Sequence, residues 1–197
     1  MSRSILITNA SSIYAGGEYY VLLLATELLS RGHRVAVSCR PDNLLLDKCR
    51  AQNIPVLPAD FPSTGKLFKN VLLLKRIIGR EKIDIVHTNT NYDRTAGAMA
   101  ARLAGVKHVA NIHSFHSISH NLTHRLRNRY WTDRFITVGE CVKGILVRDD
   151  GIPIERISTV HLGLDPEIMQ RSAELRARAR AEFRLGEGEI LLGNVGR

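Results

Sequence analysis

The feature that most constrains the fold of this chain is a regular alternation of short apolar runs with longer stretches whose apolar residues recur at helical spacing. Residues 4–8 form a short apolar run of the kind found in fully buried strands. Apolar residues then recur at helical spacing from Val21 to Leu29, and Gly32 is placed to end that helix. Because strands that alternate with helices join through right-handed crossovers, the pattern predicts an α/β fold. That fold is a Rossmann-like, doubly wound parallel sheet with helices on both faces.

The same two patterns continue along the chain. Further strands are expected at residues 35–39, 55–57, 83–87, 106–112, 135–138 and 157–161. Further helices are expected at residues 44–52, 66–80, 96–104, 120–131, 142–149 and 172–183. The helix over 66–80 is amphipathic, and its apolar face consists of Leu67, Val71, Leu74 and Ile78, with Phe68 and Leu72 beside them. We expect this face to cover the sheet, which leaves only the Lys and Arg side of the helix for contact with a membrane.

The domain organisation follows from the last part of the sequence. Residues 170–188 are rich in Arg, Ala and Glu and end in Gly-Glu-Gly, which is typical of a connector. The apolar residues 190–195 are expected to form a strand. Since a domain seldom stops directly after an apolar strand, we expect the chain to end just inside a second domain. This divides the chain into an N-terminal domain (1–170), a connecting helix and linker (171–188) and the first strand of a C-terminal domain (189–197).

Composition narrows the class of protein. The 197 residues are 44% hydrophobic and 24% charged, which excludes disorder, collagen and coiled coil as whole-chain interpretations. Cys39, Cys49 and Cys141 are widely spaced, with no CxxC pair, so neither a disulfide scaffold nor a structural zinc site is expected. No apolar run approaches the length of a membrane span, and no signal-peptide core is present. We therefore expect a cytoplasmic protein, with peripheral contact at the inner face of the cell membrane left open.

The net charge of +9 suggests polyanionic partners, such as nucleic acid, anionic lipid or phosphorylated ligands, or simply a solvated surface. One basic cluster lies beside aromatic residues: Arg125, Arg127, Arg129, Tyr130 and Trp131. Such a cluster could meet an anionic membrane or nucleic acid. The favoured interpretation is a solvated helix face with Trp131 in the core.

In an open parallel sheet, ligands bind at the carboxyl ends of the strands, so the residues that follow each strand carry the most information. The loop after the first strand contains Gly16 and Gly17 and opens a helix. Adjacent glycines let backbone amides approach a phosphate, and a helix N-terminus favours the anion. A tight turn with no ligand is an equally good explanation of this pair.

Two further loops carry polar residues. The strand over 83–87 is followed by the dense polar run 87–94, in which Asn89, Asn91 and Arg94 could read hydroxyl groups. Helix capping by Thr90 or Asn91 would explain one of these residues but not all of them. His113 follows the next strand, where it could hydrogen-bond a substrate, act as an acid or base, or be a purely structural histidine.

Several other chemistries receive little support. His113, His116, His120 and His124 would form a metal-binding face only on a continuous helix, and no carboxylate or cysteine joins them, so we expect no metal. No G-x-S-x-G elbow, Walker A motif, H-E-x-x-H motif or kinase motif set is present. Arg40 ends the second strand, where an NADP enzyme could hold the 2′-phosphate, but the glycine fingerprint of such enzymes is missing.

Taken in order, these pieces resemble the N-terminal domain of glycosyltransferase family 4, whose members have the two-domain GT-B fold. The resemblance covers essentially the whole chain. It rests on the loop 15–18 (Ala-Gly-Gly-Glu), the strand 84–87 (Asp-Ile-Val-His), His113, the segment 137–140 (Thr-Val-Gly-Glu), the segment 152–165 and the closing Gly-Asn-Val-Gly-Arg at 193–197.

The resemblance implies a retaining transferase that moves a sugar, as a hexosyltransferase does, from a nucleotide-sugar donor to an acceptor hydroxyl. It implies that Gly16, Gly17 and Arg197 contact the donor and that His113 contacts the transferred sugar. By position, Asn89, Asn91 and Arg94 line the place of the acceptor, which would be a glycan, a lipid-linked sugar or a lipopolysaccharide. No metal, no cofactor beyond the nucleotide-sugar co-substrate and no nucleic acid partner are expected.

Two positions depart from the family pattern, and two alternatives stay open. Leu162-Gly163 stands where the family usually has Asn-Gly, and Gly139 stands in place of a serine. Because a lysine and a Glu-x7-Glu segment of the family would lie beyond Arg197, this chain alone is expected to be inactive. The alternatives are a non-catalytic Rossmann-like binding module and a fragment of an NADP-dependent oxidoreductase.

Overall fold

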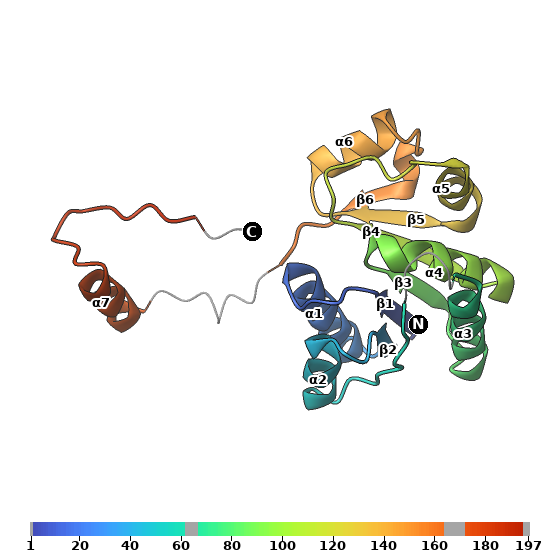
Figure 1. Cartoon of the computed structure of the whole chain (residues 1–197), viewed down its shortest axis with the longest axis horizontal. Helices are drawn as coiled ribbons and strands as arrows, with labels where there is room; N and C mark the ends of the chain where they lie inside the picture. Colours follow the sequence, from blue (N-terminus) through green and yellow to red (C-terminus); the bar gives the residue numbers. More distant parts are fainter. Residues whose placement is uncertain (1, 62–66, 164–171, 195–197) are drawn as a thin grey trace. The chain divides into compact units, whose positions relative to one another are not determined.

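The computed structural model describes residues 2–61, 67–163 and 172–194, which fall into two units, Met1–Leu162 and Gly163–Arg197. The first unit is built on a parallel sheet with the strand order β2-β1-β3-β4-β5-β6 (Figure 1). The strands are β1 (Ser4–Asn9), β2 (Arg34–Cys39), β3 (Ile85–Thr88), β4 (Lys107–Ile112), β5 (Arg134–Thr137) and β6 (Ile157–Thr159). The direction of winding reverses at β1, because β2 pairs with one side of β1 and β3 pairs with the other.

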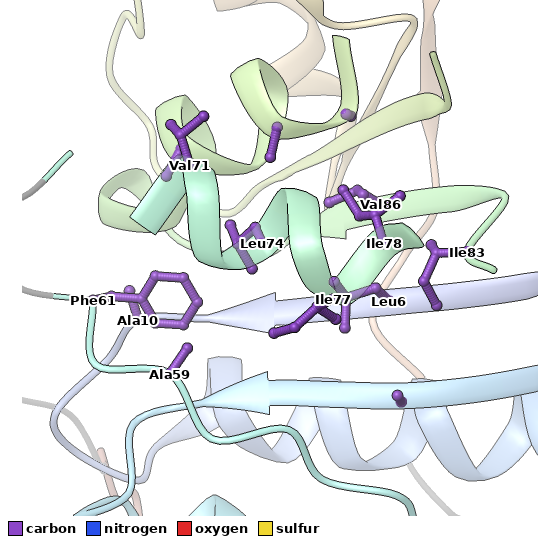
Figure 2. Close-up of a cluster of buried hydrophobic side chains, with 14 residues drawn as sticks. Leu6, Ala10, Ala59, Phe61, Val71, Leu74, Ile77, Ile78, Ile83 and Val86 are labelled. Carbon is purple, nitrogen blue, oxygen red and sulfur yellow. The ribbon is translucent and has the colours of Figure 1, made fainter. Parts of the chain in front are cut away.

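Helices lie on both faces of this sheet. They are α1 (Gly16–Ser30), α2 (Leu44–Ala51), α3 (Leu67–Arg80), α4 (Asn91–Ala104), α5 (Leu122–Leu126), the π-helix η2 (Arg127–Trp131), α6 (Glu140–Arg148) and the 3₁₀ turn η3 (Ile154–Arg156). Successive residues of β1 point to opposite faces. Ile5 and Ile7 belong to a core shared with α1 and α2, whereas Leu6 belongs to a core shared with α3 and α4 (Figure 2). The doubly wound, Rossmann-like fold is confirmed.

Helix α3 covers the sheet with only part of its apolar residues. Val71, Leu74 and Ile78 are buried in the core on this face (Figure 2). Phe68 and Leu72, one turn apart, are instead 73% and 55% exposed. These two residues therefore take no part in covering the sheet.

The strand expected at residues 55–57 is not part of the sheet. Val56 forms only an isolated parallel bridge with Val37, at the outer edge of β2. The contact consists of two backbone hydrogen bonds, from Val37 N to Pro55 O and from Leu57 N to Val37 O, each 2.9 Å long. Since Pro55 has no backbone N–H, it cannot extend the ladder as a donor.

The helix expected at residues 120–131 is divided into α5 and the π-helix η2. The wider turns of η2 direct Arg127 and Asn128 into the interior, whereas Arg125 and Arg129 are exposed. Trp131 is only partly buried, so the expectation of a tryptophan in the core is wrong and an arginine takes that place.

The second unit contains one described helix, α7 (Ala173–Glu182), whose N-cap Ser172 accepts a hydrogen bond from Leu175 N. Residues 190–194 form no strand, and Ile190 and Leu192 are exposed. The strand expected there is therefore absent over these residues, because a strand needs a neighbouring strand for its backbone hydrogen bonds. The units divide after Leu162, and the assignment of residues 189–197 to a second domain stays a prediction.

Two further observations bear on the environment of the protein. Among the described residues, no helix has the length and apolar character needed to cross a membrane. All three cysteines are free thiols, of which Cys39 and Cys49 are buried and Cys141 is exposed.

Candidate functional site

A cleft of about 910 Å³ opens at the carboxyl edge of the sheet, beside the strand where the winding reverses. It is lined chiefly by the loop after β1 with the start of α1, the loop after β3 with the first turn of α4, and the loop after β4. Ligands bind at this position in doubly wound sheets. Arg197 lies outside the described residues, and the cleft brings together the other predicted site residues: Gly16, Gly17, Asn89, Asn91, Arg94 and His113.

Gly16 and Gly17 begin α1 at a place where the protein itself has no need of glycine. Neither has a positive φ. A Cβ at Gly16 would meet no atom within 4 Å, and one at Gly17 would lie at an ordinary contact distance of 3.6 Å from Asn89 Nδ2. The tight-turn explanation is therefore not supported. Ala15 makes no side-chain cap to the helix, so the first N–H groups of α1 can receive an anion from the cleft.

Two buried carboxylates build the loops around the cleft. Glu18 accepts hydrogen bonds from Ala15 N at 2.8 Å and from Asn9 Nδ2 at 3.0 Å. Asp93 accepts from Thr90 N and Thr90 Oγ1, at 2.9 and 2.8 Å. Thr90 is thus the N-cap of α4, which confirms one of the capping alternatives, and the helix begins at residue 91 rather than 96. Sequence reasoning missed Asp93, although the Thr-x-x-Asp spacing is a capping-box signal.

Asn89 joins the three loops of the cleft. Its Nδ2 donates to Gly17 O at 3.2 Å, and its Oδ1 accepts from Asn111 Nδ2 at 3.2 Å. His113 Nε2 lies 2.9 Å from the same Oδ1. Because its polar atoms are already engaged within the protein, Asn89 positions other groups, and the expectation that its amide reads an acceptor gains no support here.

His113 is held in one orientation beside the cleft. Its ring lies edge-on to Tyr20, with centroids 5.3 Å apart. Burial lowers the pKa of His113, the nearby Glu18 carboxylate acts in the opposite direction, and the Arg94 guanidinium lowers it further. The imidazole is therefore neutral near pH 7, so one ring nitrogen can donate a hydrogen bond and the other can accept one.

Asn91 and Arg94 share the first turn of α4. Arg94 Nη2 donates to Asn91 Oδ1 at 2.6 Å. Asn91 is exposed, whereas Arg94 is only 3% exposed even though it lines the cleft. Burial lowers the pKa of Arg94 to about 10, with Asp93 and Asp150 acting in the opposite direction. Nothing in the sequence around Arg94 signals that it is buried.

Arg127 is a second buried arginine, which sequence reasoning placed on a solvated face. It donates to Asn128 Oδ1 at 2.9 Å, to Thr95 Oγ1 at 3.0 Å and to Ile118 O at 2.9 Å. These bonds join η2 to α4 and to the loop before α5. Arg127 is a structural residue, and it does not line the cleft.

Two of the weaker alternatives lose their geometric basis. Of the four histidines in the spaced series, only His124 lies in a helix, and the described part of the chain contains no group of three metal-ligand side chains. The Arg40 guanidinium at the end of β2 is paired with Asp42 at 2.9 Å and with Asp60 at 3.7 Å. A guanidinium already paired with two carboxylates is a poor partner for the 2′-phosphate of NADP.

Comparison with known proteins yields one curated relative. It is the UDP-Gal:alpha-D-GlcNAc-diphosphoundecaprenol alpha-1,3-galactosyltransferase of Escherichia coli, which is 30% identical over 132 residues. The match covers 61% of this chain and 33% of the relative, so the chain spans about a third of that protein.

Solved structures share the fold. Anabaena Alr3699/HepE, in complex with UDP and glucose, superposes with a TM-score of 0.72 at 18% identity, over 92% of this chain and 50% of that one. A glycosyltransferase from Rickettsia africae gives a TM-score of 0.76 at 16% identity, over 95% and 51%. At the level of sequence, the family model for Glycosyltransferase Family 4 matches residues 14–168, which include the start of α1 and the loops after β3 and β4. The chain belongs to glycosyltransferase family 4.

Proposed function

We propose that this chain is the acceptor-binding, N-terminal part of a retaining glycosyltransferase, which moves a sugar from a nucleotide-sugar donor to an acceptor hydroxyl. The observation that carries the proposal is the meeting, in one cleft of a family 4 chain, of the start of α1, where Ala15 makes no side-chain cap, with the neutral His113. The first suits phosphate, and the second suits a sugar hydroxyl.

In this proposal, the N–H groups of Gly16 and Gly17 approach the donor phosphates, and Arg197 grips the pyrophosphate. His113, fixed by Asn89 and Tyr20, contacts the transferred sugar and steadies the charge that develops as the bond to the leaving group breaks. Asn89 is a positioning residue. The Anabaena structure, whose bound molecules are UDP and glucose, supports a donor of this type.

The acceptor lies beside the first turn of α4, against Asn91 and Arg94. Tyr92 and Phe115 line the same cleft and are largely exposed, so they offer aromatic faces to a sugar ring or an apolar group. We assign the acceptor to the glycans and lipid-linked sugars. The Escherichia coli relative, which by its name acts on a diphosphoundecaprenol-linked sugar, supports a lipid-linked one.

We further propose peripheral contact of this cytoplasmic protein with an anionic membrane, through α3. Phe68 and Leu72 are exposed one turn apart, and Lys69, Lys75 and Arg76 are exposed on the same helix. Apolar side chains flanked by basic ones are the combination that binds anionic lipid surfaces. This corrects the expectation that only basic side chains of this helix are free for a membrane.

The test uses the complete product of the gene that encodes this chain. Radiolabelled UDP-sugars are offered with lipid-linked acceptors, and the anomeric configuration of the product is read by NMR. His113→Ala should lower turnover about 100-fold, because the contact to the transferred sugar is lost. His116→Ala is the matched control, since His116 is exposed and does not line the cleft.

The outcomes separate the alternatives. Transfer with retention that depends on His113 and not on His116 supports the proposal, and the 197-residue chain alone should transfer no sugar. Unchanged turnover in His113→Ala would remove this histidine from the site. Binding of NADPH in place of UDP-sugars would favour the oxidoreductase alternative, and binding of neither, without transfer, a non-catalytic module.

A further inference from the structure

The fold buries a guanidinium in the lining of the cleft. Arg94 is 3% exposed, yet it is one of the residues that line the cleft. Its burial is set by α4, which packs against β3 so closely that the neighbouring positions Ala96 to Ala98 are also buried. Arginine is rarely buried unless it is paired, so its hydrogen bonds and its charge need an explanation.

The donors of Arg94 are largely unused within the protein. Nη2 donates to Asn91 Oδ1, but the buried Nε has no partner among the described residues. No carboxylate of the described chain lies within 4.0 Å of this guanidinium. Arg127 shows the contrast, because each of its three nitrogens donates to a protein group. Described protein groups thus accept hydrogen bonds from all three side-chain nitrogens of Arg127 but from only one nitrogen of Arg94.

Asp93 and Asp150 act on the charge of Arg94 from a distance, and neither forms an ion pair with it. The adjacent Asp93 is engaged by Thr8, Thr90 and the backbone of Asn89, and Asp150 is engaged by Ser117 and Ile118 N. The charge of Arg94 also lowers the pKa of His108, His113, His124 and Arg127. A buried cation with no anion in contact is unfavourable, and a bound oxyanion would stabilise it.

The second arginine of the cleft does not share this property. Arg40 is paired with Asp42 and Asp60. The arginine of the cleft without an ion pair is therefore Arg94, in the first turn of α4, whereas the proposed phosphate site at the start of α1 follows β1.

We propose that Arg94 forms an oxyanion subsite which binds a phosphate or carboxylate group of the acceptor, so that the acceptor of this enzyme is anionic close to the sugar that it presents. This inference rests on the proposed function, since it names the class of acceptor for the same cleft. Guanidinium suits the role because its fork of N–H groups can bind two oxygens of one oxyanion. The Asn91 contact holds Nη2 in place, and no described residue accepts a hydrogen bond from the other guanidinium nitrogens.

The first experiment needs no catalysis. Inorganic pyrophosphate is titrated into the chain, and binding is followed by calorimetry and by NMR. Arg94→Gln should weaken binding about 10- to 100-fold, the loss expected for a charge-assisted hydrogen-bonded contact. Arg40→Gln removes the same charge from the same cleft and should keep most of the binding. Arg94→Lys keeps the positive charge but lacks the forked N–H groups of guanidinium. Its affinity for pyrophosphate should lie between those of wild type and Arg94→Gln.

The fold of each variant is checked by thermal denaturation. Arg94→Gln should melt no lower than wild type, because the change leaves no carboxylate orphaned. Should it fail to fold, the comparison of Arg94→Lys with Arg40→Gln still decides the proposal. Equal losses of pyrophosphate affinity in the Arg94 and Arg40 variants would show that only the overall positive charge attracts the anion. That result would overturn the proposed subsite.

The second experiment distinguishes the source of the oxyanion in the complete enzyme. Arg94→Gln should raise the KM for the acceptor at least 10-fold and leave the KM for the nucleotide sugar within about 2-fold. A rise in the donor KM alone would overturn the assignment to the acceptor. If the enzyme proves to be no transferase, the pyrophosphate titration still reports on the subsite, so the two proposals fail independently.

Discussion

Helix α4 approaches β3 through Gly97, and this close approach supports a quantitative prediction. A Cβ built on Gly97 would lie 2.4 Å from Thr88 Cγ2 and 3.5 Å from Val86 Cγ1, both on β3. The first distance is far inside van der Waals contact. Since Asn91 and Arg94 lie in the first turn of the same helix, the packing at Gly97 also positions the α4 side of the cleft.

We expect Gly97→Ala to destabilise the chain by about 1 to 3 kcal/mol. Overpacking of a core by one methyl group has a cost in this range, and it outweighs the gain of up to about 1 kcal/mol from helix propensity. Thr88 cannot move aside easily, because it is fully buried and its Oγ1 lies 3.1 Å from His108 Nε2. For a chain of this size, the melting temperature should fall by about 3 to 10 °C.

The control is Gly144→Ala in α6, where an added Cβ meets nothing within 4 Å. With propensity acting alone, this variant should be stabilised by about 0.5 to 1 kcal/mol. A second test removes the clashing atom, since Thr88→Ser lacks Cγ2 but keeps the hydroxyl. In that background, Gly97→Ala should lose most of its penalty, as measured by urea unfolding in a double-mutant cycle. Equal stability of the two Gly→Ala variants, or an unchanged penalty in Thr88→Ser, would refute the reasoning.

Two further predictions concern pH and lipid. Burial lowers the pKa of His87 to about 4 and of His108 to about 3. Between these values and about 6.5, the unfolded chain therefore binds more protons than the folded chain. The free energy of unfolding should fall as the pH is lowered through this window. His108→Gln should reduce the slope by up to about 1.4 kcal/mol per pH unit in urea melts between pH 7.5 and 5, and an unchanged slope would contradict a buried neutral histidine. Phe68→Ser with Leu72→Ser should weaken co-sedimentation with phosphatidylglycerol vesicles about 10-fold or more, whereas Leu103→Ser, at a site that is 57% exposed on α4, should leave it unchanged. Equal losses in the two sets of variants would argue against contact through α3.

Local pattern was sufficient for the architecture of the first unit. The apolar run at residues 4–8 and the helical spacing from Val21 to Leu29 appear as β1 and α1, with buried residues on the side expected. The prediction failed where a neighbour, and not local preference, decides the outcome. Residues 55–57 bridge only to Val37, and residues 190–194 have no strand to pair with among the described residues.

The candidate site was partly predictable, because the carboxyl ends of adjacent parallel strands must meet. This rule brought Gly16, Asn91 and His113 to one cleft, as the structure shows. It could not show that both polar atoms of the Asn89 side-chain amide already have hydrogen-bond partners in other parts of the cleft lining. Nor could it show that Arg94 is buried, since a polar residue after a strand usually lies in solvent.

The sequence by itself determined most of the strands and helices, the parallel winding of the sheet and membership of a family, because periodicity and motif order are properties of neighbouring residues. The tertiary structure alone decided which charges are left unpaired. Arg94 and Arg127 look alike in the sequence, but Arg127 meets Thr95 and the carbonyl of Ile118, whereas Arg94 faces a cleft. Desolvation and pairing depend on groups brought together from distant parts of the chain, so the unpaired charge of Arg94 arises only when the sheet and its helices are assembled.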